Sequence, residues 1–169
     1  MSFGANGLSA GEMQNVYSTL TSENLGNNSD IELRWAMKAS DHAEVYFNLI
    51  TSVEPRILRL TALDNEIYTK FRETFPDLKV DVLDEKELKS AESKEKWREF
   101  CEYFKEKVED YNFGTLLRLN CKEDYSQENS IFCVRVQFLA IEIARNREGY
   151  NDELRYTHGK LTKPSDQRS

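Results

Sequence analysis

Long apolar runs, paired cysteines and nucleotide-binding glycine loops are all missing from this 169-residue sequence. No apolar run approaches the roughly 18 residues that a membrane-spanning helix needs. The first seven residues have neither the basic start nor the apolar core of a signal peptide. The three cysteines form no C-x-x-C pair, so we expect reduced thiols rather than disulfides or a zinc site. These absences predict a cytoplasmic protein, also compatible with the nucleus, that does not bind a membrane.

Positive charge is scarcer than negative charge. The chain has 23 lysines and arginines against 30 aspartates and glutamates, which gives a formal net charge of −7. Such a surface repels nucleic-acid phosphates and anionic lipids but suits a basic protein partner. The length fits one domain with loose ends, and we expect a monomer that binds no nucleic acid.

Residues that commonly perform catalysis are also few. His42 and His158 are the only histidines and belong to no H-E-x-x-H motif, which excludes a zincin site. No G-x-S-x-G, P-loop or G-x-G-x-x-G motif occurs. His42 lies on the apolar stripe of a predicted helix, where packing is a more common role than base catalysis. The sequence therefore predicts a protein that is not an enzyme and has no cofactor or metal.

Helical periodicity is the main positive signal. Apolar residues in steps of three and four predict helices over about 30–52, 61–75 and 90–108, with a shorter helical turn at 84–88. Ser9 and Glu12 have capping-box spacing, which predicts another short helix within a largely loose N-terminal segment. We assign four side chains to the core: Trp35, Tyr46, Trp97 and Phe104.

Three segments are less clearly helical. Alternate valines favour an extended conformation over 79–83. Residues 113–119 fit either a helix or a strand. Residues 131–148 alternate like a strand at their start, but their length and the stop signals Arg145, Arg147 and Gly149 favour a helix.

The stretch around Arg145 has two interpretations. It can be the basic end of a helix in which Arg145 pairs with Glu142 at i,i+3. Alternatively, arginines beside an aromatic residue are typical of protein-binding surfaces. The second interpretation predicts a partner-binding patch made of Arg145, Asn146, Arg147 and Tyr150.

Five strings together resemble the eukaryotic polysaccharide biosynthesis domain-containing protein family. They are DIELRWAMKA at 30–39, HAEVY at 42–46, DVLD at 81–84, FGTLLRL at 113–119 and IEIARNREGY at 141–150. The resemblance implies a domain over 28–151, preceded by a segment over 1–27. We expect the tail over 152–169 to be mobile, because it has little apolar surface to bury. The resemblance implies a mainly α fold, an orthogonal helical bundle with a short extended segment near 79–83. It also favours helix at both ambiguous segments.

The resemblance further implies a dedicated chaperone that binds newly made translation elongation factor 1-alpha at its GTP-binding domain. That client is basic, so electrostatic steering toward an acidic chain is expected. Asp81 and Asp84 are then candidates for contacting basic client groups, beside the patch around Arg145. Two alternatives stay open. The first is an enzyme of polysaccharide or sugar-nucleotide metabolism, which would need a deep pocket containing His42 or several carboxylates. The second is a general interaction scaffold.

Overall fold

A computed structural model describes residues 29–162 of the chain, with side chains from Leu33 onward. Its elements in order are α2 (Ser29–Ile50), the 3-10 turn η1 (Pro55–Ile57), α3 (Asp64–Thr74), α4 (Glu85–Leu88), α5 (Ala91–Tyr103), β1 (Gly114–Arg118), β2 (Ser130–Val134), α6 (Arg135–Glu148) and α7 (Leu154–Thr157). The short helix predicted near Ser9 lies outside the described residues.

The helices predicted from apolar periodicity are confirmed, although α5 ends at Tyr103 rather than near Val108. Ser90 caps α5, because its hydroxyl accepts a hydrogen bond from the amide of Ser93 at 3.2 Å. Helix α6 ends at Gly149, whose φ of 89° is the left-handed conformation that glycine adopts without strain. Local sequence signals therefore set several of the helix ends.

The prediction of a mainly α orthogonal bundle is wrong, because the described chain combines six α-helices with a two-stranded antiparallel sheet. Strands β1 and β2 pair with Gly114 opposite Val134 and Arg118 opposite Ser130. The ambiguous segment 113–119 thus contains the strand Gly114–Arg118 and no helix, and the helix expected from residue 131 begins only at Arg135. The predicted extended segment at 79–83 contributes one antiparallel bridge, between Val82 and Asn120.

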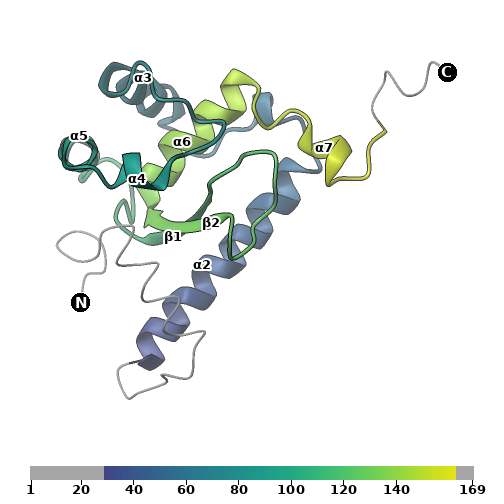
Figure 1. The fold of residues 1–169 in the computed structure, drawn as a ribbon, viewed down its shortest axis with the longest axis horizontal. Coiled ribbons are helices and arrows are strands. Elements are labelled where there is room, and N and C mark those ends of the chain that lie inside the picture. The colour runs from purple at the N-terminus through teal and green to yellow at the C-terminus, as the bar shows by residue number, and fades with distance from the viewer. Residues whose placement is uncertain (1–28, 163–169) are drawn as a thin grey trace.

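The sheet packs between two helices. Strand β1 contacts both α2 and α6, and α6 also contacts α3 and α5 (Figure 1). Consequently all five residues of β1 are buried. In Figure 1, α2 runs as a long diagonal past the sheet, while α3 and α5 lie toward the opposite end of the molecule.

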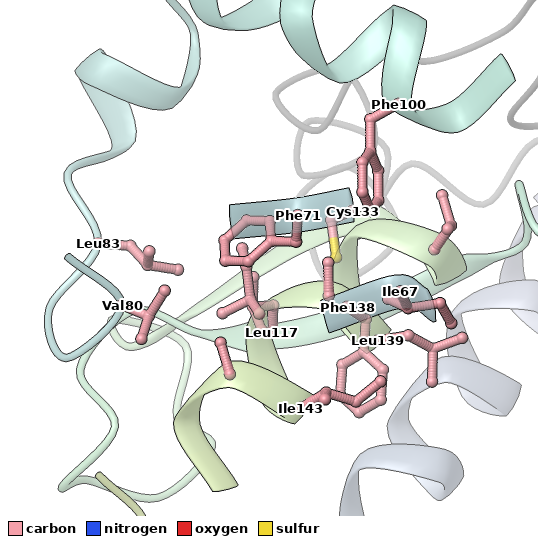
Figure 2. Close-up of a cluster of buried hydrophobic side chains, with 14 of the residues drawn as sticks. Ile67, Phe71, Val80, Leu83, Phe100, Leu117, Cys133, Phe138, Leu139 and Ile143 are labelled. Carbon is pink, nitrogen blue, oxygen red and sulfur yellow. The ribbon is translucent and has the colours of Figure 1, made fainter. Parts of the chain in front are cut away.

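Two groups of apolar side chains form the core. The larger joins α3, α5, α6 and the sheet, and includes Phe71, Phe100, Leu117 and Ile143 (Figure 2). In the smaller, Trp35 of α2 stacks on Phe132 of β2 with ring centroids 4.8 Å apart. The four core assignments are confirmed, since Trp35, Tyr46, Trp97 and Phe104 are all buried.

Helix α7 lies in the segment that the sequence assigned to a tail. Leu154 at its start is buried in the core, and the ring Nε2 of His158 lies 3.1 Å from the carbonyl oxygen of Lys122. All three cysteines are free thiols, as predicted. Within residues 29–162 no helix is long and apolar enough to cross a bilayer, and no cluster of three or more potential metal ligands occurs there.

Candidate functional site

A groove of about 640 Å³ opens between α2, the sheet and the 120–130 connection. Helix α2 contributes one face to it, because residues at i, i+3, i+4, i+7 and i+8 share a side of a helix. Its lining residues are Ser40, Ala43, Glu44, Phe47, Asn48, Leu116, Asp124, Tyr125, Ser126, Gln127, Glu128, Ser130 and Phe132. We call this hollow the α2 groove.

The α2 groove has an apolar floor and an acidic rim. Ala43, Phe47, Leu116 and Phe132 supply the floor. Three carboxylates, those of Glu44, Asp124 and Glu128, line the rim, and no basic side chain occurs among the described lining residues. Such a surface can hold an apolar side chain while attracting lysines or arginines around it.

Specific hydrogen bonds fix the connection that forms one wall of the groove. The Asn129 side-chain amide donates to the carbonyl oxygens of Asn120 at 3.1 Å and Asp124 at 2.9 Å. The Asn129 side-chain oxygen accepts from the amide of Asn120 at 2.8 Å. The Tyr125 hydroxyl donates to the carbonyl oxygen of Leu116 at 3.3 Å, and its ring packs edge-on against Phe47. The wall is therefore preorganised, which lowers the entropic cost of binding.

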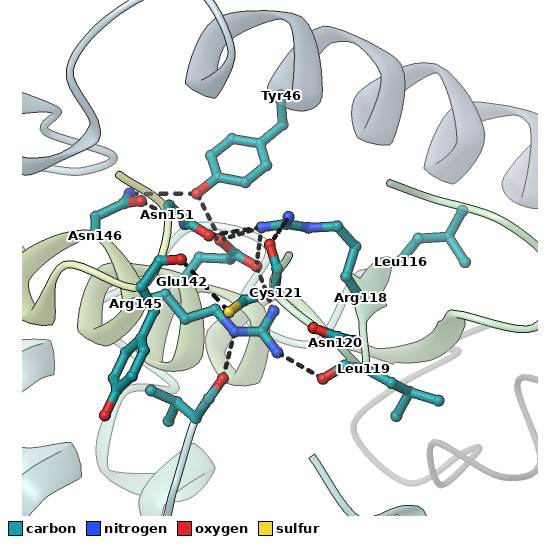
Figure 3. A network of polar contacts seen from close by, with 12 residues as sticks. Tyr46, Leu116, Arg118, Leu119, Asn120, Cys121, Glu142, Arg145, Asn146 and Asn151 are labelled. Atoms are coloured by element: carbon teal, nitrogen blue, oxygen red, sulfur yellow. Dashed lines mark hydrogen bonds and ion pairs between the residues drawn. The ribbon is translucent and has the colours of Figure 1, made fainter. Parts of the chain in front are cut away.

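A buried polar network lies below the groove (Figure 3). The Arg118 guanidinium lies 5.6 Å from the ring centroid of Phe47 and 5.8 Å from that of Tyr125. It donates to both carboxylate oxygens of Glu142, at 3.2 and 3.3 Å, and to the carbonyl oxygen of Cys121 at 2.7 Å. Two groove side chains thus rest on a charged group that is itself fully buried.

Glu142 is the centre of this network. It accepts hydrogen bonds from the Tyr46 hydroxyl at 2.8 Å, from Arg145 at 2.9 Å and from the Asn151 amide at 3.0 Å. Burial on its own would raise the pKa of Glu142, but the charges of Arg118 and Arg145 outweigh it and hold that pKa at about 2. Burial and the neighbouring carboxylate raise the pKa of Tyr46 well above its usual value. The network stays charged and paired at neutral pH.

The structure divides the predicted patch around Arg145. Arg145 and Asn146 are buried, at 0% and 2% exposure, whereas Arg147 and Tyr150 are exposed. Arg145 pairs with Glu142 at i,i+3 and also donates to the carbonyl oxygens of Val80 at 2.6 Å and Leu119 at 3.0 Å. The four residues therefore do not form one surface patch. The interpretation as a helix-end ion pair with Glu142 is confirmed.

Other predicted residues lie away from the groove. Asp84 uses its carboxylate to cap α4, accepting from the amide of Lys86 at 2.9 Å. Asp81 is half-buried, and its carbonyl oxygen accepts from the amide of Cys121 at 2.9 Å. Neither aspartate lines the groove, and His42 does not line it either.

Sequence analysis identified residues 120–130 only as a polar loop, and it did not predict the α2 groove. One signal was available there, since Tyr125 is a single aromatic residue among acidic and polar neighbours in CKEDYSQEN. The matching wall on α2 gave no signal, because Ser40, Glu44 and Asn48 look like an ordinary solvated helix face.

Comparison with known proteins matches most of the described region to one family. The sequence profile of the PBDC1 protein family matches residues 31–156. Protein PBDC1 of Mus musculus is 61% identical over 129 residues, which cover 76% of this chain and 65% of the mouse protein. Protein PBDC1 of Homo sapiens is 56% identical over 144 residues, which cover 84% of this chain and 62% of the human protein. The chain thus spans less than two thirds of the length of these two relatives.

A solved structure shares the fold. The solution NMR structure of protein yst0336 from Saccharomyces cerevisiae superposes with a TM-score of 0.70 and 48% sequence identity. The match covers 82% of this chain and 97% of the yeast chain.

Proposed function

The chain belongs to the PBDC1 protein family, and on that premise we propose that it is a binding protein, a dedicated chaperone for newly synthesised translation elongation factor 1-alpha. The family resemblance noted in the sequence implies this client and its GTP-binding domain. The observation that carries the proposal here is the α2 groove, with its apolar floor, three carboxylates and no basic side chain among its lining residues within 29–162. A basic client segment with one apolar anchor fits that chemistry.

Charge on the whole chain supports the same partner. A net charge of −7 steers a basic client toward the surface before any specific contact forms. The preorganised wall at 120–130 then supplies a shape that a segment can enter without much reordering of the binder. Steering and shape together suit a protein that holds an incompletely folded basic chain.

The test is capture of freshly translated elongation factor 1-alpha by the tagged chain. We expect Glu44→Lys/Glu128→Lys to lower capture by about tenfold or more, because like charges then face the client across the groove. The matched control is Glu95→Lys/Glu99→Lys, which makes the same charge change on exposed positions of α5. Full capture by a folded groove variant would remove the groove from the proposal. Absence of capture by the unchanged protein would remove the client.

The enzyme alternative makes a different prediction. An enzyme acting on sugars or sugar nucleotides would turn over its substrate, and that turnover would depend on a group in the groove such as Glu44 or Asp124. Nothing in the groove geometry favours this reaction class over the binding of a basic segment. We therefore keep the binding role as the conclusion.

A further inference from the structure

A second, smaller hollow lies beside α2, away from the groove. It measures about 250 Å³ and is lined by Lys38, Ala39, His42, Asp110, Phe113, Gly114, Thr115 and Arg135. Lys38 and His42 are one turn apart on α2 and lie roughly on the opposite side of that helix from the groove residues. We call this hollow the Lys38 pocket.

Three nitrogen-bearing side chains from two helices converge on the Lys38 pocket. Lys38 and His42 come from α2, and Arg135 is the first residue of α6. The Lys38 ammonium lies 5.8 Å from the ring centroid of Phe113 at the pocket wall. Asp110 is the one carboxylate among the described lining residues, so Lys38 and Arg135 leave a net positive charge.

Two side-chain nitrogen atoms of the pocket residues have no hydrogen-bond partner within the part of the chain that is described. The Nδ1 of His42 and the Nε of Arg135 are buried and have no hydrogen-bond partner in the described structure. Among residues 33–162, neither Lys38 nor Arg135 forms an ion pair. A buried polar nitrogen without a partner costs free energy, and a small rotation of the His42 or Arg135 side chain would let an oxyanion in the hollow accept from it.

The backbone at the pocket is also unusual. Asp110 has a φ of 53°, the only positive value for a non-glycine residue in the described chain. Its carbonyl oxygen accepts a hydrogen bond from the amide of Phe113 at 2.9 Å, which holds the turn that forms this wall. Strained backbone conformations of this kind persist where the surroundings fix them, and they cluster at ligand-binding sites.

We propose that the Lys38 pocket binds a single phosphate-sized oxyanion, held by Lys38, His42 and Arg135. The donors come from α2 and from the start of α6, and lysine and arginine side chains are common phosphate-binding groups. A hollow of about 250 Å³ has room for one phosphoryl group. This site is separate from the groove and does not depend on the proposed client.

Nuclear magnetic resonance of the two histidines tests the proposal. Burial and then the charge of Arg135 lower the pKa of His42, so a bound oxyanion should raise it, since it would stabilise the protonated ring. Inorganic phosphate is titrated against sodium chloride at matched ionic strength. We expect phosphate to shift the His42 resonance and raise its pKa while His158, which is not among the pocket's lining residues, stays unchanged.

Variants identify the groups that hold the anion. We expect Arg135→Gln and Lys38→Gln each to weaken phosphate binding about tenfold, the loss of one charge-assisted hydrogen bond. Arg98→Gln, an exposed position on α5, is the matched control and should bind phosphate as the unchanged protein does. Lys38 is exposed, so its variant remains informative even when Arg135→Gln fails to fold.

Blocked phosphoserine, titrated in the same way, distinguishes the source of the phosphoryl group. Tighter binding than inorganic phosphate indicates a phosphorylated side chain, whereas binding of inorganic phosphate alone indicates a free anion. Identical His42 behaviour in phosphate, phosphoserine and chloride would overturn the proposal, as would unchanged binding in both pocket variants.

Discussion

Glu142 balances two buried guanidinium groups, Arg118 and Arg145, and all three side chains are fully buried. Removing one partner of such an arrangement leaves charge uncompensated in a region of low dielectric constant. The same carboxylate orders Tyr46 and Asn151, so it connects α2, β1, α6 and the chain before α7. Glu142 thereby stabilises the buried polar network that lies beneath the α2 groove.

Glu142→Gln should lower the free energy of unfolding by about 3 to 5 kcal/mol, since breaking a buried ion pair leaves its partners unpaired. Urea denaturation followed by circular dichroism measures the change. Glu66→Gln is the comparison, because Glu66 pairs with Lys107 at the surface, where an ion pair contributes little. Equal losses in the two variants would contradict a special role for Glu142.

Acid should unfold the protein partly through the same residue. The pKa of Glu142 is about 2 in the folded chain and near its usual 4.5 when unfolded, so between these values the unfolded state binds more protons. The stabilisation is complete above the unfolded pKa and is lost as the pH falls toward 2. We expect the difference in unfolding free energy between the unchanged protein and Glu142→Gln to shrink across this window. A difference that stays constant there would rule out the linkage.

The residues of this network show how far sequence reasoning reaches. The i,i+3 spacing of Glu142 and Arg145 was enough to predict their ion pair. The spacing could not show that both side chains are buried. Their burial depends on contact with Arg118, which comes from a different element, β1. Sequence neighbours of Arg145 suggested a surface, whereas its spatial neighbours are a carboxylate and two backbone carbonyls.

At the scale of elements, the contact of α2 with β1 depends on one glycine. A Cβ atom at Gly114 would lie 1.6 Å from Cζ2 of Trp35, so any side chain there must displace the indole ring. Because α2 and β1 approach closely at this glycine, the α2 wall of the groove lies next to the sheet residues that form another part of its lining.

Gly114→Ala should therefore lower the free energy of unfolding by about 1 to 3 kcal/mol, the usual cost of overpacking a core. The control is the double variant Gly114→Ala/Trp35→Phe, in which a smaller ring makes room for the new methyl group. Thermal or urea denaturation of the unchanged protein, the two single variants and the double variant gives the coupling free energy between Gly114 and Trp35. Strictly additive losses would contradict a direct contact as the cause.

The strands were the elements that pattern could not identify. All five residues of β1 are buried although Thr115 and Arg118 are polar, so its sequence GTLLR shows no clear alternation and its adjacent leucines also fit a helix. Strand β2 passes directly into α6 at Val134, an apolar residue that gives no N-cap signal. The cap comes from Gln137, whose side-chain oxygen accepts from the amide of Val134 at 3.1 Å. The amphipathic helices α3 and α5 each have one solvated face, and there the helical period was sufficient.

At the scale of the whole molecule, α2 separates two hollows of opposite character. The α2 groove carries Glu44, Asp124 and Glu128, whereas the Lys38 pocket carries Lys38 and Arg135. The overall negative charge predicted a basic partner, but composition could not show how charge is distributed between two sides of one helix. That distribution depends on the three-dimensional arrangement of loops 104–113 and 120–130.

Hydrogen exchange of the chain, alone and with the GTP-binding domain of elongation factor 1-alpha diluted from denaturant, tests the central claim most directly. Our account predicts slower amide exchange at residues 40–48 and 124–130, the two walls of the α2 groove, with the loop amides showing the larger effect. Formation of a complex with unchanged exchange in both segments, or with slowing confined to the region of Arg147 and Tyr150, would contradict it.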